Sequence, residues 1–416
     1  MKKNFGKLCV GGVFLIGLSM SLTSCEDILG EWSRPTPNPV TPGGGSSTIA
    51  VTGVKLNEAY LRFDKNVLTA QTLTATVSPA DATDKTVTWE SSNESVATVD
   101  ENGQVTPITK GTVTITATAH DGSGMKATST VIVYDKIVDI STDISVDAGE
   151  SWLINGTGTT EAKSITIANH SKVTLNGINI TKGINCTDNA TIILADGSEN
   201  KVTAPDYKAG IQIGGTGTTL TINAETAGTG ILNVTGGDCG AGIGMRDCGD
   251  DNVTGGDITI NGGVINATGG DNAAGIGTGY AFDFSELYST SNQCGDITIN
   301  GGTVTATGGN NAAGIGTGHS QKQSQTVNQT CGDITIATGV TSVTAKRDGT
   351  GSTILIGKGN ASGGGTQKCG KIKFGTAEVF DGASPGTWSP SPMAAGNYGG
   401  LKLAISGSTW ELTPAN

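Results

Sequence analysis

Residues 255–279 and 294–318 carry one 25-residue segment twice, as GGDITINGGVINATGGDNAAGIGTG and CGDITINGGTVTATGGNNAAGIGTG, with five differences. Each copy contains three short runs of aliphatic, threonine or alanine residues, separated by glycine and asparagine. Tandem copies of this length occupy equivalent environments only when the fold itself is repetitive. The duplication therefore restricts this part of the chain to a repeat architecture.

The three runs recur in the same order beyond the two copies. The first run lies at Ile165, Ile192, Leu220, Ile258, Ile297, Ile334 and Ile372, at spacings of 27, 28, 38, 39, 37 and 38 residues. Three strands per repeat in a fixed order are typical of a parallel β-helix, whose rungs stack at about 4.8 Å. We predict an all-β fold with a right-handed parallel β-helix of three strands per rung over residues 135–416. Residues 136–156 and the tail from Asp381 are expected to cap its two ends.

The composition agrees with short strands and many turns, since 65 of 416 residues are glycine and only 4 % are aromatic. The formal net charge of −12 argues against nucleic acid and against an anionic membrane surface as partner.

The N-terminus has the pattern of an export signal. Lys2, Lys3 and Lys7 precede an apolar run over residues 8–22 that is too short to span a bilayer, so residues 1–24 are interpreted as a signal peptide. The following segment, residues 25–48, is rich in Pro, Gly, Ser and Thr and is interpreted as a tether.

The sequence LTSC at residues 22–25 resembles a bacterial lipobox, and the two acidic residues after it resemble the surface-export tag of Bacteroidota lipoproteins. The resemblance implies that Cys25 carries a lipid and that the protein is an outer-membrane lipoprotein facing the cell exterior.

Residues 49–134 contain five alternating runs separated by turn-forming clusters, which predicts a small antiparallel β-sandwich. Two segments resemble the group 2 bacterial immunoglobulin-like domain: VTGVKLN and LTATVSPADATDKTVTWESSNESVATVDENGQVTPITKGTVTITATA. Trp89 is the expected core tryptophan, and Asn102-Gly103 is the expected hairpin turn. The resemblance implies a stalk.

Each long rung carries an insertion after its GIG run, at residues 245–254, 280–293, 319–330 and 360–368. Because the insertions share a position in the rung, they are predicted to stack as a wall of loops beside the β-helix. The second insertion is the candidate carbohydrate site, and its candidate ligand-binding residues are Tyr280, Phe282, Asp283, Phe284, Glu286 and Tyr288. The alternative is that these rings only pack the loop onto the solenoid.

Asp257, Asp296 and Asp333 occupy one position in successive rungs, where a bridging Ca²⁺ would relieve their mutual repulsion. A solvated acidic edge is the alternative, because water screens exposed charge.

Four cysteines suggest two disulfide pairs. Cys331 and Cys369 should be ladder neighbours, and Cys248 should lie close to Cys294, within the range that a disulfide accepts. Stacked free thiols are the alternative.

Many parallel β-helices cleave pectin, but the sequence motifs that carry the acidic, His and Arg residues of such enzymes are missing here. The repeats over residues 164–376 instead resemble carbohydrate-binding β-helix proteins of polysaccharide-using bacteria. We therefore expect a chain that is not an enzyme, in which an Ig-like stalk presents a β-helix that binds glycan or a host surface. A polysaccharide lyase or glycoside hydrolase and a purely architectural adhesin are the alternatives.

Replacement of Cys25 by alanine tests the anchor. Cys25→Ala removes the thiol that would carry the lipid, so the variant should move from the membrane fraction to the soluble extract. Fractionation of the two proteins by immunoblotting measures this, and unchanged membrane association of the variant would refute lipidation.

Overall fold

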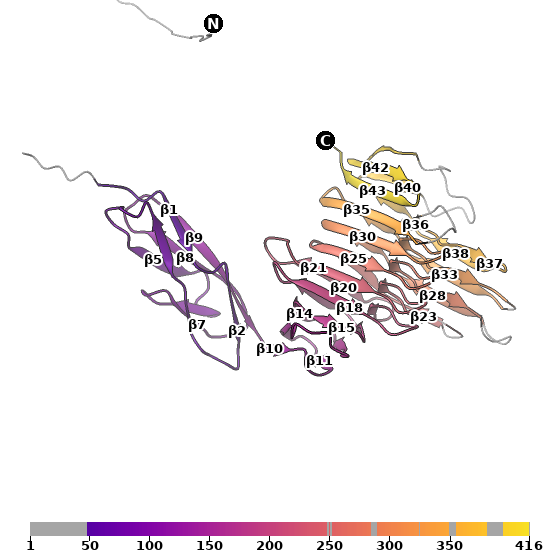
Figure 1. The fold of residues 1–416 in the computed structure, drawn as a ribbon, viewed down its shortest axis with the longest axis horizontal. Helices are drawn as coiled ribbons and strands as arrows, with labels where there is room; N and C mark the ends of the chain where they lie inside the picture. The colour runs from indigo at the N-terminus through magenta and orange to yellow at the C-terminus, as the bar shows by residue number, and fades with distance from the viewer. Residues whose placement is uncertain are drawn as a thin grey trace, which may run out of the picture. The chain divides into compact units, whose positions relative to one another are not determined.

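The computed structural model describes residues 48–247, 249, 252–283, 289–323, 325–348, 355–380 and 394–415, and these ranges consist of β-strands, turns and irregular segments (Figure 1). In them no helix is long and apolar enough to cross a membrane. The predicted signal peptide, Cys25 and nearly all of the tether lie outside the described residues. Residues from Ile49 onward form one compact unit.

The first nine strands form an Ig-like sandwich. They are β1 (Gly53–Leu56), β2 (Tyr60–Asp64), β3 (Gln71–Thr72), β4 (Ala75–Ser78), β5 (Val87–Ser91), β6 (Ala97–Val99), β7 (Gln104–Pro107), β8 (Gly111–Ala119) and β9 (Lys126–Tyr134). Their hydrogen-bonded orders are β2-β9-β8-β5, β3-β7-β6 and β1-β4. The expectation of a wholly antiparallel sandwich is wrong at one place, because β2 runs parallel to β9.

Strict alternation in β8 builds the core of the sandwich. Val113, Ile115 and Ala117 are buried, while the threonines between them are less buried. Trp89 is half-buried and packs against this core from its edge rather than filling its centre. Gly103 lies in the predicted turn between β6 and β7 with φ of 78°, and a Cβ there would lie 2.8 Å from the Trp89 ring. Glycine is therefore required by both conformation and packing.

One residue, Asp135, separates β9 from β10, so the sandwich passes into the β-helix without a linker. Asp135 is buried and pairs with Lys65 at 2.5 Å and Lys110 at 3.2 Å. Its carboxylate also accepts the backbone N–H of Ser151, the first residue of β12, at 2.8 Å. Pairing compensates the desolvation of this carboxylate at the junction.

Three parallel sheets form the β-helix (Figure 1). The first contains β10 (Lys136–Asp139), β12 (Ser151–Asn155), β14 (Ser171–Asn176), β17 (Ala190–Leu194), β20 (Thr219–Ala224), β24 (Asp257–Ile260), β29 (Ile297–Ile299), β34 (Ile334–Ile336) and β39 (Ile372–Phe374). The second contains β11 (Ile144–Val146), β13 (Ile165–Ile167), β16 (Ile184–Cys186), β19 (Ile211–Ile213), β22 (Ile243–Gly244), β26 (Ile276–Gly277), β31 (Ile315–Gly316) and β36 (Ile356–Gly357). The third contains β15 (Asn179–Ile180), β18 (Glu199–Thr203), β21 (Ile231–Thr235), β25 (Val264–Thr268), β30 (Gly302–Gly308) and β35 (Val340–Arg347). The prediction of an all-β chain with an Ig-like sandwich followed by a parallel β-helix is confirmed.

The predicted register holds in the long rungs and fails in the short ones. Ile258, Ile297, Ile334 and Ile372 form one column, as the spacing predicts. Leu220, however, lies opposite Ala190 rather than Ile192, and Ile165 belongs to the second sheet rather than the first. A slip of two residues preserves the inward and outward alternation, so spacing alone does not detect it.

The N-terminal cap is also corrected. Strands β10 and β12 join the first sheet and β11 joins the second, so residues 136–155 are the opening strands of the β-helix itself.

The insertions are not loops throughout, because most of them form two further parallel sheets. The fourth sheet contains β23 (Asn252–Thr254), β28 (Thr290–Cys294), β33 (Val327–Cys331) and β38 (Thr366–Cys369), and the fifth contains β27 (Ala281–Phe282), β32 (Ser320–Gln321) and β37 (Ala361–Ser362). Thr290, Asn292 and Cys294 are buried along β28, while Ser291 and Gln293 are more exposed. Polar residues at inward positions hide the apolar alternation that would have predicted a strand.

Antiparallel strands cover the last rung. Strand β40 (Ala377–Phe380) turns back on β39, and β41 (Gly396–Tyr398), β42 (Leu401–Ser406) and β43 (Thr409–Pro414) extend the third sheet from β35. Trp410 is buried on β43. The described part of the tail therefore forms the expected cover, while residues 381–393 lie outside the described ranges.

Glycine 277 tests the stacking of the rungs. Its φ is 136°, and a Cβ there would overlap the carbonyl oxygen of Gly316 in the next rung. Gly277→Ala should lower the free energy of unfolding by about 3 kcal/mol or more, because the backbone of Gly316 cannot rotate away from the new methyl group as a side chain could. Gly217→Ala is the control, since its φ is 83° with nothing within 4 Å, so only about 1 kcal/mol of strain is expected. Denaturant titration measures both; equal losses would contradict the predicted clash.

Candidate functional site

Tyr280, Phe282 and His319 form a row of rings beside the fifth sheet, which we call the aromatic strip. The Tyr280 and Phe282 ring centroids are 5.9 Å apart with 22° between the planes, and those of Tyr280 and His319 are 5.7 Å apart with 3°. The Tyr280 hydroxyl donates a hydrogen bond of 2.7 Å to Gln321 Oε1. Parallel β-pairing of β27 with β32 places Phe282 opposite Gln321, so the rung spacing brings these groups together.

His319 is held as a neutral ring. It is buried; its Nδ1 donates to the Asn360 carbonyl at 2.8 Å, and its Nε2 lies 3.1 Å from the Ser362 hydroxyl. Burial lowers the pKa of His319 below its ordinary value of 6.5, against the opposing effect of the Asn360 carbonyl. The strip therefore contains no charged ring at neutral pH.

Asp283 supports the backbone rather than facing a ligand. It is buried, and its two oxygens accept the backbone N–H groups of Gln323 and Gln325, each at 2.7 Å. Its expected role as a ligand-binding residue is therefore corrected to a positioning role between neighbouring rungs. The other candidates of this insertion, Phe284, Glu286 and Tyr288, lie outside the described residues.

Two glutamines that the sequence did not single out hold the fourth and fifth sheets together. Gln329 is buried, donates to the carbonyls of Gly279 and His319 at 2.7 and 2.8 Å, and accepts from the Thr278 hydroxyl. Gln367 repeats this arrangement one rung later with Gly318 and Thr317. Both pairs have the same sequence pattern: a Gly-Thr-Gly segment is followed about 50 residues later by the glutamine.

The aspartate column bridges rungs through hydrogen bonds. Asp257 accepts the backbone N–H of Asp296 at 2.8 Å, Asp296 accepts that of Asp333 at 2.7 Å, and Asp333 accepts that of Lys371 at 2.7 Å. Among the described residues, no group of three or more His, Cys, Asp or Glu is arranged to hold a metal ion. The carboxylates therefore form a ladder in which each pairs with a backbone N–H group of the following rung.

The cysteine column has the predicted register but consists of free thiols. Cys331 lies opposite Cys294 on one side and Cys369 on the other. All three are buried and free, so the expected disulfide between Cys331 and Cys369 is corrected. Hydrogen bonds with Cys294 and Cys369, together with burial, raise the pKa of the Cys331 thiol. Cys248, the other half of the second expected pair, lies outside the described residues.

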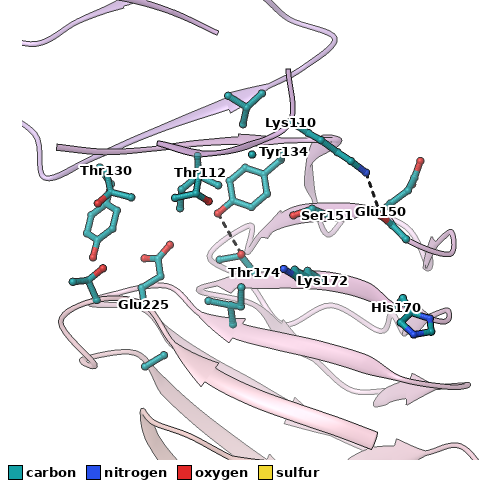
Figure 2. A pocket seen from close by; sticks show the side chains of 18 residues that line it. Lys110, Thr112, Thr130, Tyr134, Glu150, Ser151, His170, Lys172, Thr174 and Glu225 are labelled. Atoms are coloured by element: carbon teal, nitrogen blue, oxygen red, sulfur yellow. Dashed lines mark hydrogen bonds between the residues drawn. The ribbon is translucent and has the colours of Figure 1, made fainter. Parts of the chain in front are cut away.

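A cavity of about 630 Å³ lies between strands β8 and β9 and the outer face of the first sheet (Figure 2). Figure 2 shows Lys110, Thr112 and Tyr134 on one wall, and Lys172, Thr174 and Glu225 on the other. The Tyr134 hydroxyl donates to Thr174 Oγ1 at 3.2 Å across it. The residues come from segments far apart in the chain, so no sequence motif marks this cavity.

Comparison with known proteins identifies the two kinds of domain. Residues 50–131 match the Bacterial Ig-like domain (group 2), and residues 258–280 and 297–319 match the Beta helix repeat. The chain thus contains a group 2 Ig-like domain followed by β-helix repeats.

Curated relatives match over short stretches. An uncharacterized protein of Clostridium acetobutylicum is 41 % identical over 21 % of this chain and 21 % of its own length. Lacto-N-biosidase of Bifidobacterium bifidum is 41 % identical over 25 % of this chain and 9 % of its own length. Kappa-carrageenase of Pseudoalteromonas carrageenovora is 41 % identical over 23 % of this chain and 24 % of its own length. The chain spans less than a quarter of the length of the curated relatives it matches.

These relatives correct one expectation. The expectation that the chain is not an enzyme is contradicted by partial matches to proteins named as a lacto-N-biosidase, an alpha-L-arabinofuranosidase and a kappa-carrageenase. The combination of an Ig-like domain, β-helix repeats and such relatives fits a carbohydrate-related protein, in which binding and cleavage are both open.

Titration of His319 tests the electrostatics of the strip. The chain has three histidines, so the ring signal that disappears in His319→Gln identifies this residue by proton NMR. Its midpoint should lie below pH 6.5, because burial disfavours the charged ring. The unfolded chain then takes up this proton first as pH falls, so His319 should reduce stability below about pH 6.5. A midpoint at or above 6.5 would contradict the buried neutral ring.

Proposed function

We propose that this protein is a lipid-anchored surface protein in which the Ig-like domain is a stalk and the β-helix binds carbohydrate through the aromatic strip. The observation that carries the proposal is the co-facial arrangement of Tyr280, Phe282 and His319 in a ring row without formal charge. The partly exposed Tyr280 and Phe282 rings suit the C–H face of a sugar, while neighbouring polar groups suit its hydroxyls.

The scaffold supports this role by holding the strip rigidly. Tyr280 is tied to Gln321 at its hydroxyl, and the buried glutamine Gln329 bonds the backbone of Gly279 directly before it. A binding surface fixed in advance loses little conformational entropy when a ligand binds. The relatives that are named for carbohydrate-degrading activities support carbohydrate as the ligand class.

The anchor and the exterior location belong to the same proposal. They are supported by the lipobox-like residues ending at Cys25 and by the proline- and glycine-rich tether that follows. An Ig-like domain directly joined to the β-helix through Asp135 would hold the strip away from the membrane surface.

Carbohydrate cleavage is the second candidate function. It is favoured by the segments shared with lacto-N-biosidase and kappa-carrageenase. A reducing-sugar release assay on the glycans that bind distinguishes it: release by the wild-type protein supports cleavage, and retention without release supports binding.

Phe282→Ala tests the strip. Loss of one ring face should weaken glycan retention on an array about tenfold, since aromatic contacts are worth roughly 0.5–1.5 kcal/mol beyond their buried area. Tyr207→Ala is the matched control, because Tyr207 is 55 % exposed on the same β-helix and belongs to neither the strip nor the cavity. Arrays are read with and without calcium, and melting temperatures are recorded. A large loss of melting temperature with unchanged binding would show that the ring only packs the insertion.

A further inference from the structure

Glu225 lines the cavity between β8, β9 and the first sheet, and one oxygen of its carboxylate lacks a hydrogen-bond partner among the described residues. Glu225 follows β20, and its side chain is only 5 % exposed. Its Oε2 accepts Arg62 Nη2 at 2.6 Å and the Asp196 backbone N–H at 2.9 Å. Its Oε1 is buried and has no hydrogen-bond partner among the described residues. Leaving such an oxygen unpaired costs about 1–3 kcal/mol or more, so a donor in the cavity would be favoured.

The other lining groups define the chemistry of that donor. The partly exposed Tyr60 and Ile132 side chains provide apolar surface, and Thr112 and Thr130 provide hydroxyls. Two lysines, Lys110 and Lys172, balance the formal charge of Glu150 and Glu225, so the lining favours neither a cation nor an anion. A volume of about 630 Å³ falls within the range of small-ligand sites, which occur preferentially at such junctions.

We propose that this cavity is a second binding site, which takes a neutral sugar residue. One sugar hydroxyl donates to Glu225 Oε1, the lysine ammonium groups donate to other sugar oxygens, and the Tyr60 and Ile132 side chains contact the apolar face of the ring. A sugar supplies donors and acceptors together with C–H surface in one uncharged ring, which matches this lining. The site is separate from the aromatic strip, since its walls are formed by the Ig-like domain and the early rungs.

A cavity-filling variant tests the site while leaving Glu225 and its hydrogen bonds in place. Thr112 is exposed and lines the cavity, so Thr112→Trp should occupy the space of the ligand. Thr116→Trp is the matched control, because Thr116 lies on the same face of β8 outside the cavity. Phe282→Ala serves as the variant of the aromatic strip. The probes are methyl β-D-galactopyranoside, methyl N-acetyl-β-D-glucosaminide and methyl α-L-arabinofuranoside, with galacturonate and choline as charged comparators.

Saturation-transfer NMR and calorimetry on the full chain measure binding. At least one neutral glycoside should bind, Thr112→Trp should weaken its binding at least tenfold, and Thr116→Trp should leave its binding unchanged. Binding that survives Thr112→Trp but is lost in Phe282→Ala overturns the cavity site and supports the strip. Preference for galacturonate or choline, or no binding of any neutral probe at millimolar concentration, also overturns the proposal. Weaker glycan retention by Phe282→Ala on the array tests the aromatic strip alone and neither supports nor opposes the cavity site.

Discussion

Backbone hydrogen bonds between successive rungs are the interaction on which the β-helix depends. They hold Ile258, Ile297, Ile334 and Ile372 in one column, and the two-residue period of a strand keeps such a column on the core side throughout. The same pairing places Gly277 directly below Gly316, where a side chain would meet backbone. Register and corner geometry together explain why the chain repeats specific residues and not only a pattern of hydrophobicity.

Rung pairing also determines the role of the polar residues. Asp257, Asp296 and Asp333 resemble a metal-binding set in the sequence, yet each carboxylate accepts a backbone N–H from the following rung. Gln329 and Gln367 use both ends of their amides inside the insertions. Buried polar groups must find partners, and in a solenoid the nearest partners are the equivalent groups one rung away. Residues that look like ligands therefore serve as connectors between rungs.

The two binding proposals lie where this regularity is interrupted. The aromatic strip stands beside the fifth sheet, which exists only in the long rungs, and the cavity lies where the Ig-like strands meet the early rungs. Elsewhere in the described rungs, aliphatic side chains fill most of the interior. Fold type alone does not determine function, so the carbohydrate assignment rests on these surfaces and on the partial matches to carbohydrate-degrading enzymes.

The sequence by itself determined the two domain types and the turn at Gly103. It also determined the columns through Ile258 and Cys331, because the near-identical repeats leave one consistent alignment. It did not determine the register around Ile192, where a two-residue slip preserves the burial pattern, nor strand β28, whose inward residues include Thr290 and Asn292. The tertiary structure alone decided that Asp283 faces backbone, that His319 stacks on Tyr280, and that Glu225 lines a cavity opposite Thr112. Such contacts join residues tens to more than a hundred positions apart, and local propensity and periodicity carry no information about which distant segments meet.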